Sequence, residues 1–415
     1  MKRIKSLLPK GFFIIIAFLL ALFPLLLSWP GKAAAVKEWD KDSIYVAGNL
    51  VSRDGIIYEA AWWTQGEDPA KQSDEWGVWR IPSGTAAKPG KKPDTTPNTK
   101  KPQEKPVKTA GSKDKHTGLA SHIITGYWQN FNNGAKCLKI SDVPKEYNLI
   151  AVAFAKQASV SGRVTFRLDK TLCQKLGGYN KLQFINDIKA AKKKGQRVTI
   201  SIGGENGTVS VTNTKEAKRF ASSIYNLMKE YGFDGVDIDL EHGINSKYMA
   251  KALRLLSKKA GKSLIITLAP QTLDMQNKNT EYFKLALKIK DILTIVNTQY
   301  YNSGSMLGAD GKVYSQGSAD FLAALASIQL ENGLRPDQTG IGVPASVKGA
   351  GSGYVPPSIV NKALNCLVKG KKTGSYKPKK KYKKLRGVMC WSVNWDADNH
   401  YIFLKKVAPV IASLP

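Results

Sequence analysis

The sequence predicts a (β/α)8 barrel, the TIM-barrel fold, preceded by a small all-β module. Eight short apolar segments alternate with amphipathic stretches over about 300 residues, the count and size of such a barrel. A doubly wound sheet also alternates, but no G-x-G-x-x-G segment follows an early strand here. The eight strand candidates are residues 123–128, 149–155, 197–203, 235–241, 264–269, 292–301, 340–344 and 387–393.

The segments between the strand candidates carry the apolar spacing of helices. In residues 214–231, apolar side chains recur at intervals of three and four, and Gly232 follows as a stop signal. We therefore expect a helix that buries one side against the sheet. The repeating positions are Ala217, Phe220, Ala221, Ile224, Met228 and Tyr231.

The first 35 residues have the order of a secretory leader. A positive segment is followed by an apolar run over residues 12–29 and by three alanines, Ala33 to Ala35. This order predicts a signal peptide over residues 1–35. The alternative is an uncleaved membrane anchor, because the apolar run is nearly long enough to span a bilayer. In both cases the rest is exported, so we expect a secreted, extracellular protein with no stable membrane association once the leader is cleaved.

Three further segments follow the leader. Residues 36–82 are rich in aromatics, and Asp54-Gly55 is the turn signal of a hairpin between two β-prone runs. Residues 83–117 consist largely of Lys, Pro and Thr, which predicts an extended, self-repelling linker. Residues 118–415 form the predicted barrel domain.

The net charge of +31 invites a nucleic-acid interpretation, but its distribution argues against one. The leader and the linker hold +5 and +6, and residues 369–386 alone hold +10. A protein that binds a duplex is expected to show a basic stripe on a folded face, or aromatic residues interleaved with Arg. Neither pattern is visible, so no nucleic-acid partner is predicted.

Three carboxylates share one side of a strand candidate. If residues 234–241 are extended, Asp237, Asp239 and Glu241 face one way and the aliphatic residues between them face the other. In a barrel they would point into the interior, with Glu241 at the C-terminal mouth where barrel enzymes place their chemistry. The alternative is the solvated polar face of an antiparallel strand. The helices expected before and after this strand candidate in the sequence favour the barrel.

Crowded carboxylates are costly unless they share protons or bind a cation. One interpretation is a Mg²⁺ or Ca²⁺ site. The other is acid catalysis, in which Asp237 and Asp239 share a proton and tune Glu241. We favour acid catalysis without a metal, because the other strand ends supply aromatic and amide groups that suit an acetamido sugar. Those groups are Tyr127, Trp128, Gln299, Tyr301, Asn302, Trp391 and Trp395.

Four motifs on four strand candidates resemble the family 18 glycoside hydrolases, the chitinases. Residues 234–241 are similar to that family's D-x-x-D-x-D-x-E signature, and residues 201–204 to its S-x-G-G motif. Residues 299–302 resemble its Q-x-Y-N motif, and Trp391 resembles its aromatic floor. Residues 39–79 resemble the small chitin-binding modules attached to such enzymes, which implies that Trp62 or Trp63 is an exposed sugar platform.

The resemblance implies a substrate-assisted, retaining hydrolysis with no cofactor. Glu241 would protonate the glycosidic oxygen while the substrate's own acetamido carbonyl attacks the anomeric carbon to form an oxazolinium. Asp239 would hold the acetamido N–H, and Asp237 would hydrogen-bond Asp239. Tyr301 would position the acetamido oxygen, and Trp391 would form the floor under the sugar. Gln299, Asn302, Tyr127 and Trp128 are expected to bind substrate.

The sequence thus predicts a secreted endo-chitinase, a monomer whose partners are chitin and N-acetylglucosamine oligomers. Between Pro344 and Pro357 there is no room for an α+β insertion, so we expect a shallow, open groove. One alternative is an endo-β-N-acetylglucosaminidase acting on N-glycan cores. Another is a non-catalytic chitin-binding lectin, which the presence of Glu241 disfavours.

The four cysteines are widely spaced, so a structural zinc site is not expected. After export they predict either up to two disulfides or buried free thiols. The hypothetical pairs are Cys137–Cys173 and Cys366–Cys390, the second because Cys390 would face outward beside a lumen-facing Trp391. The basic residues 369–386 are expected at the bottom of the barrel, away from catalysis.

Overall fold

The computed structural model describes residues 36–45, 48–60, 64, 66–73, 78–82, 114 and 116–415. The chain divides into two compact units, Met1–Glu104 and Lys105–Pro415. The predicted leader, nearly all of the predicted linker, and both Trp62 and Trp63 lie outside the described residues. Within the described part, none of the helices combines the length and the apolar character that crossing a membrane requires.

The N-terminal unit contains a three-stranded antiparallel sheet. It consists of β1 (Leu50–Arg53), β2 (Ile56–Ala60) and β3 (Trp79–Arg80). The predicted hairpin is present, and Asp54 and Gly55 join β1 to β2 with φ angles of 54° and 75°, as its two-residue turn requires. Trp79 is fully buried in a small core, and its indole Nε1 donates to the carbonyl of Glu67 at 2.7 Å.

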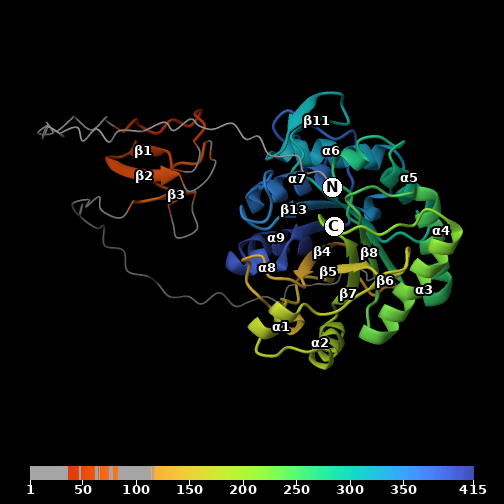
Figure 1. Cartoon of the computed structure of the whole chain (residues 1–415). Helices are drawn as coiled ribbons and strands as arrows, with labels where there is room; N and C mark the ends of the chain where they lie inside the picture. Colours follow the sequence, from red (N-terminus) through yellow and green to blue (C-terminus); the bar gives the residue numbers. More distant parts are fainter. Residues whose placement is uncertain are drawn as a thin grey trace, which may run out of the picture. The chain divides into compact units, whose positions relative to one another are not determined.

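The C-terminal unit is a closed barrel of eight parallel strands, and each of the eight strand candidates is confirmed (Figure 1). The barrel closes because β4 pairs with both β14 and β5. A two-residue strand, β6 (Val164–Thr165), pairs in antiparallel fashion with the end of β5. The barrel strands are β4 (Ile123–Gln129), β5 (Leu149–Gln157), β7 (Arg197–Gly203), β8 (Gly235–Asp239), β9 (Ile265–Leu268), β10 (Ile295–Gln299), β13 (Thr339–Pro344) and β14 (Gly387–Trp391).

Helices surround the barrel, and a short hairpin of β11 (Ser305–Leu307) and β12 (Val313–Ser315) precedes α6. The predicted helix over 214–231 is α3, and Gly232 ends it in the left-handed conformation. The helices are α1 (Lys170–Lys175), α2 (Lys181–Lys193), α3 (Thr214–Tyr231), α4 (Ser246–Ala260), α5 (Glu281–Lys288), α6 (Ala319–Glu331), α7 (Pro357–Lys369), α8 (Val393–Asp398) and α9 (Ile402–Ala412), with 3₁₀ turns η1 (Ile140–Asp142), η2 (Leu273–Met275) and η3 (Pro336–Gln338).

The barrel interior is layered from apolar to polar. Its lower end is filled by a cluster that includes Ile123, Leu149, Ile265 and Ile295, each near the start of its strand. The residues that alternate with this inward set face the helices and join the main core. The bottom of the barrel is therefore a stability layer, and the carboxylates of β8 lie above it.

The two predicted disulfides are not formed, since all four cysteines are free thiols. Cys390 does face outward as expected, but its Sγ lies 3.3 Å from the hydroxyl of Tyr147. The Sγ of Cys137 lies 3.9 Å from the side-chain oxygen of Asn132. Each of these two thiols is therefore turned toward a polar neighbour rather than toward a second cysteine.

The basic residues 369–386 do not stay at the bottom of the barrel. The backbone N–H of Ser375 donates to Asp320, in the first turn of α6, at 2.8 Å. Helices that follow barrel strands begin at the mouth, so this contact lies at the catalytic end. Lys379 pairs with Glu331 at the other end of α6. The segment therefore runs along the outside of α6, and the prediction of a bottom-face loop was wrong for its middle part.

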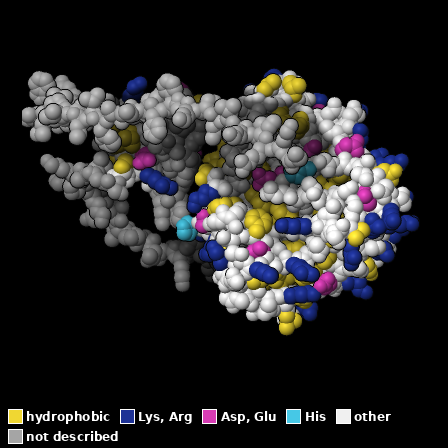
Figure 2. Space-filling model, in the orientation of Figure 1, with side chains coloured by type: hydrophobic (Ala, Val, Ile, Leu, Met, Phe, Trp, Pro, Cys, Tyr) yellow, Lys and Arg dark blue, Asp and Glu magenta, His cyan; other side chains and the backbone are white. Residues whose placement is uncertain are grey.

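Other Lys and Arg side chains gather on the outer helices. Figure 2 shows them along the right-hand edge, where Figure 1 places α3 and α4. A shallow hollow of about 470 Å³ in this region is lined by Lys251, Arg254 and Lys258 of α4 and by Lys288 of α5. Part of the positive charge of the barrel domain is thus carried on the outer helix surface.

Candidate active site

The carboxylates come from β8 and the two residues after it. The strand ends at Asp239, so Glu241 lies just beyond it. The strand candidate 235–241 placed Glu241 inside the strand. The register places Ser201 of β7 and Thr267 of β9 directly beside Asp237. A small hydroxyl residue thus flanks the carboxylate on each neighbouring strand.

Asp237 is completely buried and accepts three hydroxyl hydrogen bonds. Its Oδ2 accepts from Tyr127 at 2.7 Å and from Ser201 at 2.6 Å, and its Oδ1 accepts from Thr267 at 2.5 Å. Burial raises the pKa of Asp237, and these three donors oppose that increase by stabilising the charged form. Asp237 is thus built as a buried carboxylate that can remain ionised.

Fewer hydrogen-bond donors stabilise a negative charge on Asp239 than on Asp237. It is 3% exposed, and the amide Nε2 of Gln299 donates to its Oδ1 at 2.8 Å. Burial raises the pKa of Asp239 well above its usual value, and the charges of Asp237 and Glu241 add to the increase. Of the two carboxyls, Asp239 therefore favours the protonated form more strongly, and Asp237 is the one whose negative charge is stabilised by hydrogen bonds. The expected hydrogen bond between the two carboxyls is not formed, because three hydroxyls occupy the oxygens of Asp237.

Glu241 is the half-buried member of the trio and lines the cleft. The side-chain amide of Gln271 lies 3.4 Å from its Oε2. Burial raises the pKa of Glu241, and the neighbouring carboxylate of Glu205 adds to this increase. A raised pKa keeps a glutamic acid protonated closer to neutral pH, which suits a general acid.

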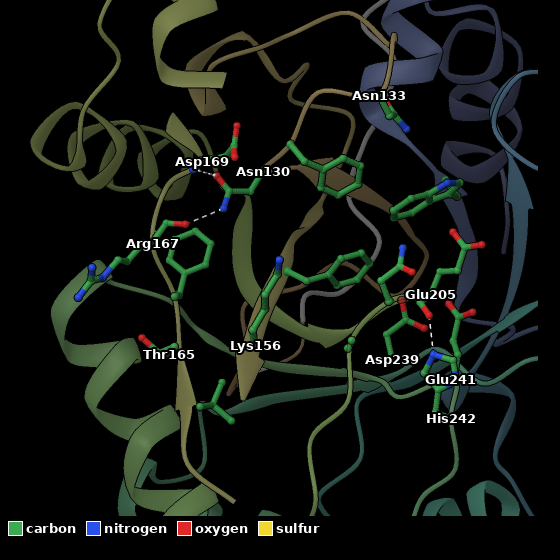
Figure 3. A pocket seen from close by; sticks show the side chains of 18 of the residues that line it. Asn130, Asn133, Lys156, Thr165, Arg167, Asp169, Glu205, Asp239, Glu241 and His242 are labelled. Atoms are coloured by element: carbon green, nitrogen blue, oxygen red, sulfur yellow. Dashed lines mark hydrogen bonds between the residues drawn. The ribbon is translucent and has the colours of Figure 1, made fainter. Parts of the chain in front are cut away.

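A cleft of about 1720 Å³ opens above these groups. Figure 3 shows Asp239, Glu241 and His242 on one side of it and Arg167, Thr165 and Asn130 on the other. The aromatic ring of Trp391 lies in its wall, 5.5 Å from the ring of Tyr127 and 5.8 Å from that of Phe154. The cleft therefore combines an acid with an apolar surface of the size of a sugar ring.

The remaining predicted residues divide between the cleft and the core. Tyr301, Gln299 and Asn302 line the cleft, and the side-chain oxygen of Asn302 accepts from the backbone of Ser352 at 2.9 Å. Trp395, one of the aromatic residues expected to suit a sugar, also lines the cleft although it is 7% exposed.

Trp128 does not lie in the cleft. Tyr127 points into the barrel, so Trp128 points outward, where its ring packs 5.6 Å from that of Phe184. Its indole N–H donates to the carbonyl of Leu138 at 3.0 Å, and the side chain is fully buried. The predicted substrate contact of Trp128 is therefore wrong, and strand alternation could have excluded it.

A tight backbone contact holds β7 against the end of β8. Gly203 has a φ of 113°, and a Cβ there would lie 2.1 Å from the carbonyl oxygen of Asp239. The N–H of Gly204 donates to that same carbonyl at 2.7 Å. These glycines of the S-x-G-G motif serve close approach of the backbone, which fixes the height of Asp239.

Some contributors were missed from the sequence. Ser201 lies in a recognised motif but had no role assigned, and Thr267 gave no signal beyond its place in a strand. Phe131 and Phe154 line the cleft beside Trp391, although neither was singled out. Among the described residues, no group of three His, Cys, Asp or Glu side chains is arranged to hold a metal ion.

The site places an acid beside an aromatic wall of the size of a sugar ring, at the mouth of a closed barrel. This combination is typical of the barrel glycoside hydrolases. The sequence pattern described as glycosyl hydrolases family 18 matches residues 123–380, and that of carbohydrate-binding module family 5/12 matches residues 38–80. The chain belongs to glycosyl hydrolase family 18 and carries an N-terminal module of the second family.

Named relatives agree with this assignment. Chitinase D of Niallia circulans is 34% identical over 334 residues, which cover 71% of this chain and 62% of that protein. Exochitinase 1 of Streptomyces olivaceoviridis is 33% identical over 324 residues, covering 67% and 54%. This chain thus spans less than two thirds of either relative. A solved structure named for chitinase A of Streptomyces coelicolor is 57% identical with a TM-score of 0.69, covering 71% of this chain and 99% of that one.

Proposed function

We propose that this protein is a secreted endo-chitinase that hydrolyses β-1,4 linkages between N-acetylglucosamine units with retention of configuration. The observation that carries the proposal is the arrangement of Glu241, Asp239 and Asp237. A half-buried acid reaches the cleft, a buried carboxyl with a strongly raised pKa lies behind it, and a buried carboxyl that accepts three hydroxyl hydrogen bonds lies behind both. Glu241 is positioned for proton transfer, while Asp239 and Asp237 are too enclosed to serve as the nucleophile of an ordinary retaining glycosidase.

In the first step Glu241 donates its proton to the glycosidic oxygen, and the bond from that oxygen to the anomeric carbon breaks. The carbonyl oxygen of the same sugar's acetamido group attacks the anomeric carbon and forms an oxazolinium ion. Asp239, beside Glu241, accepts a hydrogen bond from the acetamido N–H through a carboxyl oxygen, and the negative charge of Asp237 behind it stabilises the positive charge. Tyr301 lies in the cleft wall and orients the acetamido oxygen, while Trp391 supports the sugar ring.

In the second step Glu241, now a carboxylate, takes a proton from a water molecule that attacks the anomeric carbon. The oxazolinium opens, the acetamido group is restored and the β configuration is retained. Using one group as acid and then as base follows from microscopic reversibility. Asp237 supports both stages, because its three hydroxyl partners keep a negative charge close to Asp239.

Endo cleavage and secretion rest on further observations. The connection from β13 to α7, residues 345–356, holds no added domain, so nothing inserted there encloses the cleft. The match of residues 38–80 to a carbohydrate-binding module supports attachment to a polymer. The leader-like residues 1–35 support export.

The test is the product set from acetylated oligomers of defined length, with the anomeric form recorded at early times. We expect internal cleavage and β-anomers as the first products. Release of a single product size from one chain end would reject the endo assignment. Equal cleavage of a fully deacetylated polymer would reject substrate assistance. Release of N-glycans from a glycoprotein, without hydrolysis of colloidal chitin, would point to an endo-β-N-acetylglucosaminidase instead.

A further inference from the structure

One arm of the cleft carries an unbalanced positive charge. Beyond the catalytic carboxylates, the wall is built by the end of β5, by β6 and by the chain that leads into α1. Between residues 156 and 170 this wall contributes four cations, Lys156, Arg163, Arg167 and Lys170, and one carboxylate, Asp169. We call these four side chains the basic arm.

The cations of the basic arm are exposed to the cleft and are not neutralised by ion pairs. All four residues are exposed, and no salt bridge involves any of them within the part of the chain that the structure describes. Asp169 is occupied as the N-cap of α1, where its carboxylate accepts from the N–H of Leu172 at 2.8 Å. Glu230, a second acid of this wall, is paired with Lys181.

The arm is held in place by the start of α3. Glu216 accepts hydrogen bonds from the N–H of Thr212 at 2.6 Å and from the hydroxyl of Ser161 at 2.8 Å, and such bonds, the Thr212 N–H foremost, lower its pKa to about 2. Gly162 has a φ of 77°, and a Cβ there would lie 2.7 Å from the Cα of Glu216. The turn between β5 and β6 is therefore fixed against α3, which holds the backbone of this part of the arm in position.

Lys156 lies between Arg167 of the basic arm and the catalytic carboxylates (Figure 3). It lies on β5, and Figure 3 shows it between the Arg167 side of the cleft and the side that carries Asp239 and Glu241. Its pairing partner in the sheet is Thr165 of β6, so its backbone is part of the anchored hairpin. A sugar chain that leaves the catalytic carboxylates along this arm passes Lys156 first.

We propose that the basic arm is a specificity element that excludes glucosamine, the deacetylated and positively charged form of the sugar, from the binding positions that it lines. N-acetylglucosamine is neutral and is not repelled, whereas each protonated amine meets several fixed cations. This inference rests on the proposed chitinase function and adds a restriction at positions away from the cleaved bond. It predicts that the enzyme tolerates glucosamine on one side of the cut and rejects it on the other.

The test compares two substrates, a soluble chitosan that is about half acetylated and a fully acetylated hexamer. The readout is the ratio of kcat/KM for chitosan to kcat/KM for the hexamer, so a general loss of activity cancels. For the double variant Lys156→Gln and Arg167→Gln we expect this ratio to rise about 3- to 10-fold, because repulsion between partly solvated charges is moderate. The reversal Lys156→Glu should raise the ratio further than Lys156→Gln does.

A matched control removes the same charge elsewhere. Lys258→Gln with Lys288→Gln lies on the outer helices and should leave the ratio unchanged. Raising the salt concentration should raise the ratio of the parent enzyme and have less effect on the cleft variant, because salt screens exposed charges. Sequencing of the chitosan products should show glucosamine depleted on one side of the cleavage site in the parent and restored there in the variant.

Equal ratios for the parent and both cleft variants, or an equal rise in the outer-helix control, would overturn the inference while leaving the proposed function intact. A parent enzyme that hydrolyses neither substrate would instead overturn the proposed function and this inference with it. Thermal denaturation of each variant identifies one that fails to fold. The single change Lys156→Gln, at an exposed position, then decides the question.

Discussion

The hydroxyl of Tyr127 donates a hydrogen bond to Asp237 Oδ2 at 2.7 Å, across the barrel interior from β4 to β8. The two residues are 110 positions apart in the chain. Tyr127 also contacts the ring of Trp391 edge-on, so one side chain connects the buried carboxylate to the aromatic wall of the cleft. The hydroxyl stabilises the charge on Asp237, and that charge in turn keeps Asp239 protonated.

Tyr127→Phe is expected to lower kcat about 10-fold with little change in KM, because one of three donors to a buried carboxylate is lost. Tyr300→Phe is the matched control. Its hydroxyl is also buried, but it bonds to Gln329 on the helix side of the strand. Both variants should lose stability, and only the first should lose turnover. An equal loss of kcat in both would contradict the role given to Tyr127.

Glu241→Gln should reduce kcat by about 10²- to 10⁴-fold, the usual contribution of a general acid. The amide keeps nearly the same shape, so binding of acetylated oligomers should change little. Steady-state kinetics and oligomer binding by calorimetry check both parts. A variant that cleaved chitin oligomers as fast as the parent would overturn the mechanism.

Asp239→Asn should stabilise the fold while removing activity. Burial and the charge of Asp237 raise the folded-state pKa of Asp239 above its ordinary value of 3.8. Below that ordinary value both states are protonated. As the pH rises toward the folded pKa, only the unfolded chain ionises, and stability is lost. The asparagine side chain does not ionise in either state, so the variant does not lose stability in this way.

The gain in Tm for Asp239→Asn should therefore grow as the pH rises above about 4 and reach a few degrees. Thermal denaturation of the parent and the variant at several pH values measures it. Glu146→Gln, an exposed carboxylate outside the cleft, serves as the control and should show no such trend. A variant less stable than the parent at neutral pH would contradict the raised pKa assigned to Asp239.

Glu205→Gln should move the alkaline limb of the kcat/KM profile to lower pH. Glu241 must be protonated to act as the acid, so activity falls as the pH rises through its pKa. The carboxylate of Glu205 contributes to the increase in that pKa, and its removal lowers the pKa of Glu241. An unchanged limb, or a shift to higher pH, would show that Glu205 does not act on the acid.

Removal of residues 36–117 should impair hydrolysis of insoluble chitin several-fold more than hydrolysis of soluble oligomers. The carbohydrate-binding match lies at residues 38–80, whereas the acid and the cleft lie in the barrel. Rates on colloidal chitin and on a hexamer measure the two effects. Equal losses on both substrates would refute a separate binding role for the module.

The barrel could be predicted from the sequence because its periodicity is local. Alternating apolar residues mark each strand, and three to four residue spacing marks helices such as α3. The inward direction of Asp237, Asp239 and Glu241 followed from the same alternation. The bounds of the strands were predicted less accurately, since β8 ends two residues before Glu241.

The partners of those side chains could not be predicted in the same way. Strand alternation turns Trp128 away from the barrel interior, but its contact with Phe184 joins residues that are far apart in the sequence. The route of residues 369–386 along α6 depends on Asp320 in the first turn of that helix, which accepts hydrogen bonds from Ser375. Contacts of this kind join distant residues and leave no pattern in the sequence.

The sequence by itself determined the barrel, its N-terminal module and the row of three acids, because each depends on residues close together in the chain. Only the tertiary structure decided the charge state of those acids. Closing the barrel brings Tyr127, Ser201 and Thr267 from three other strands onto Asp237, and it leaves Asp239 with one amide. Hydrogen bonding and burial at that point set the pKa order, and neither exists before the strands meet.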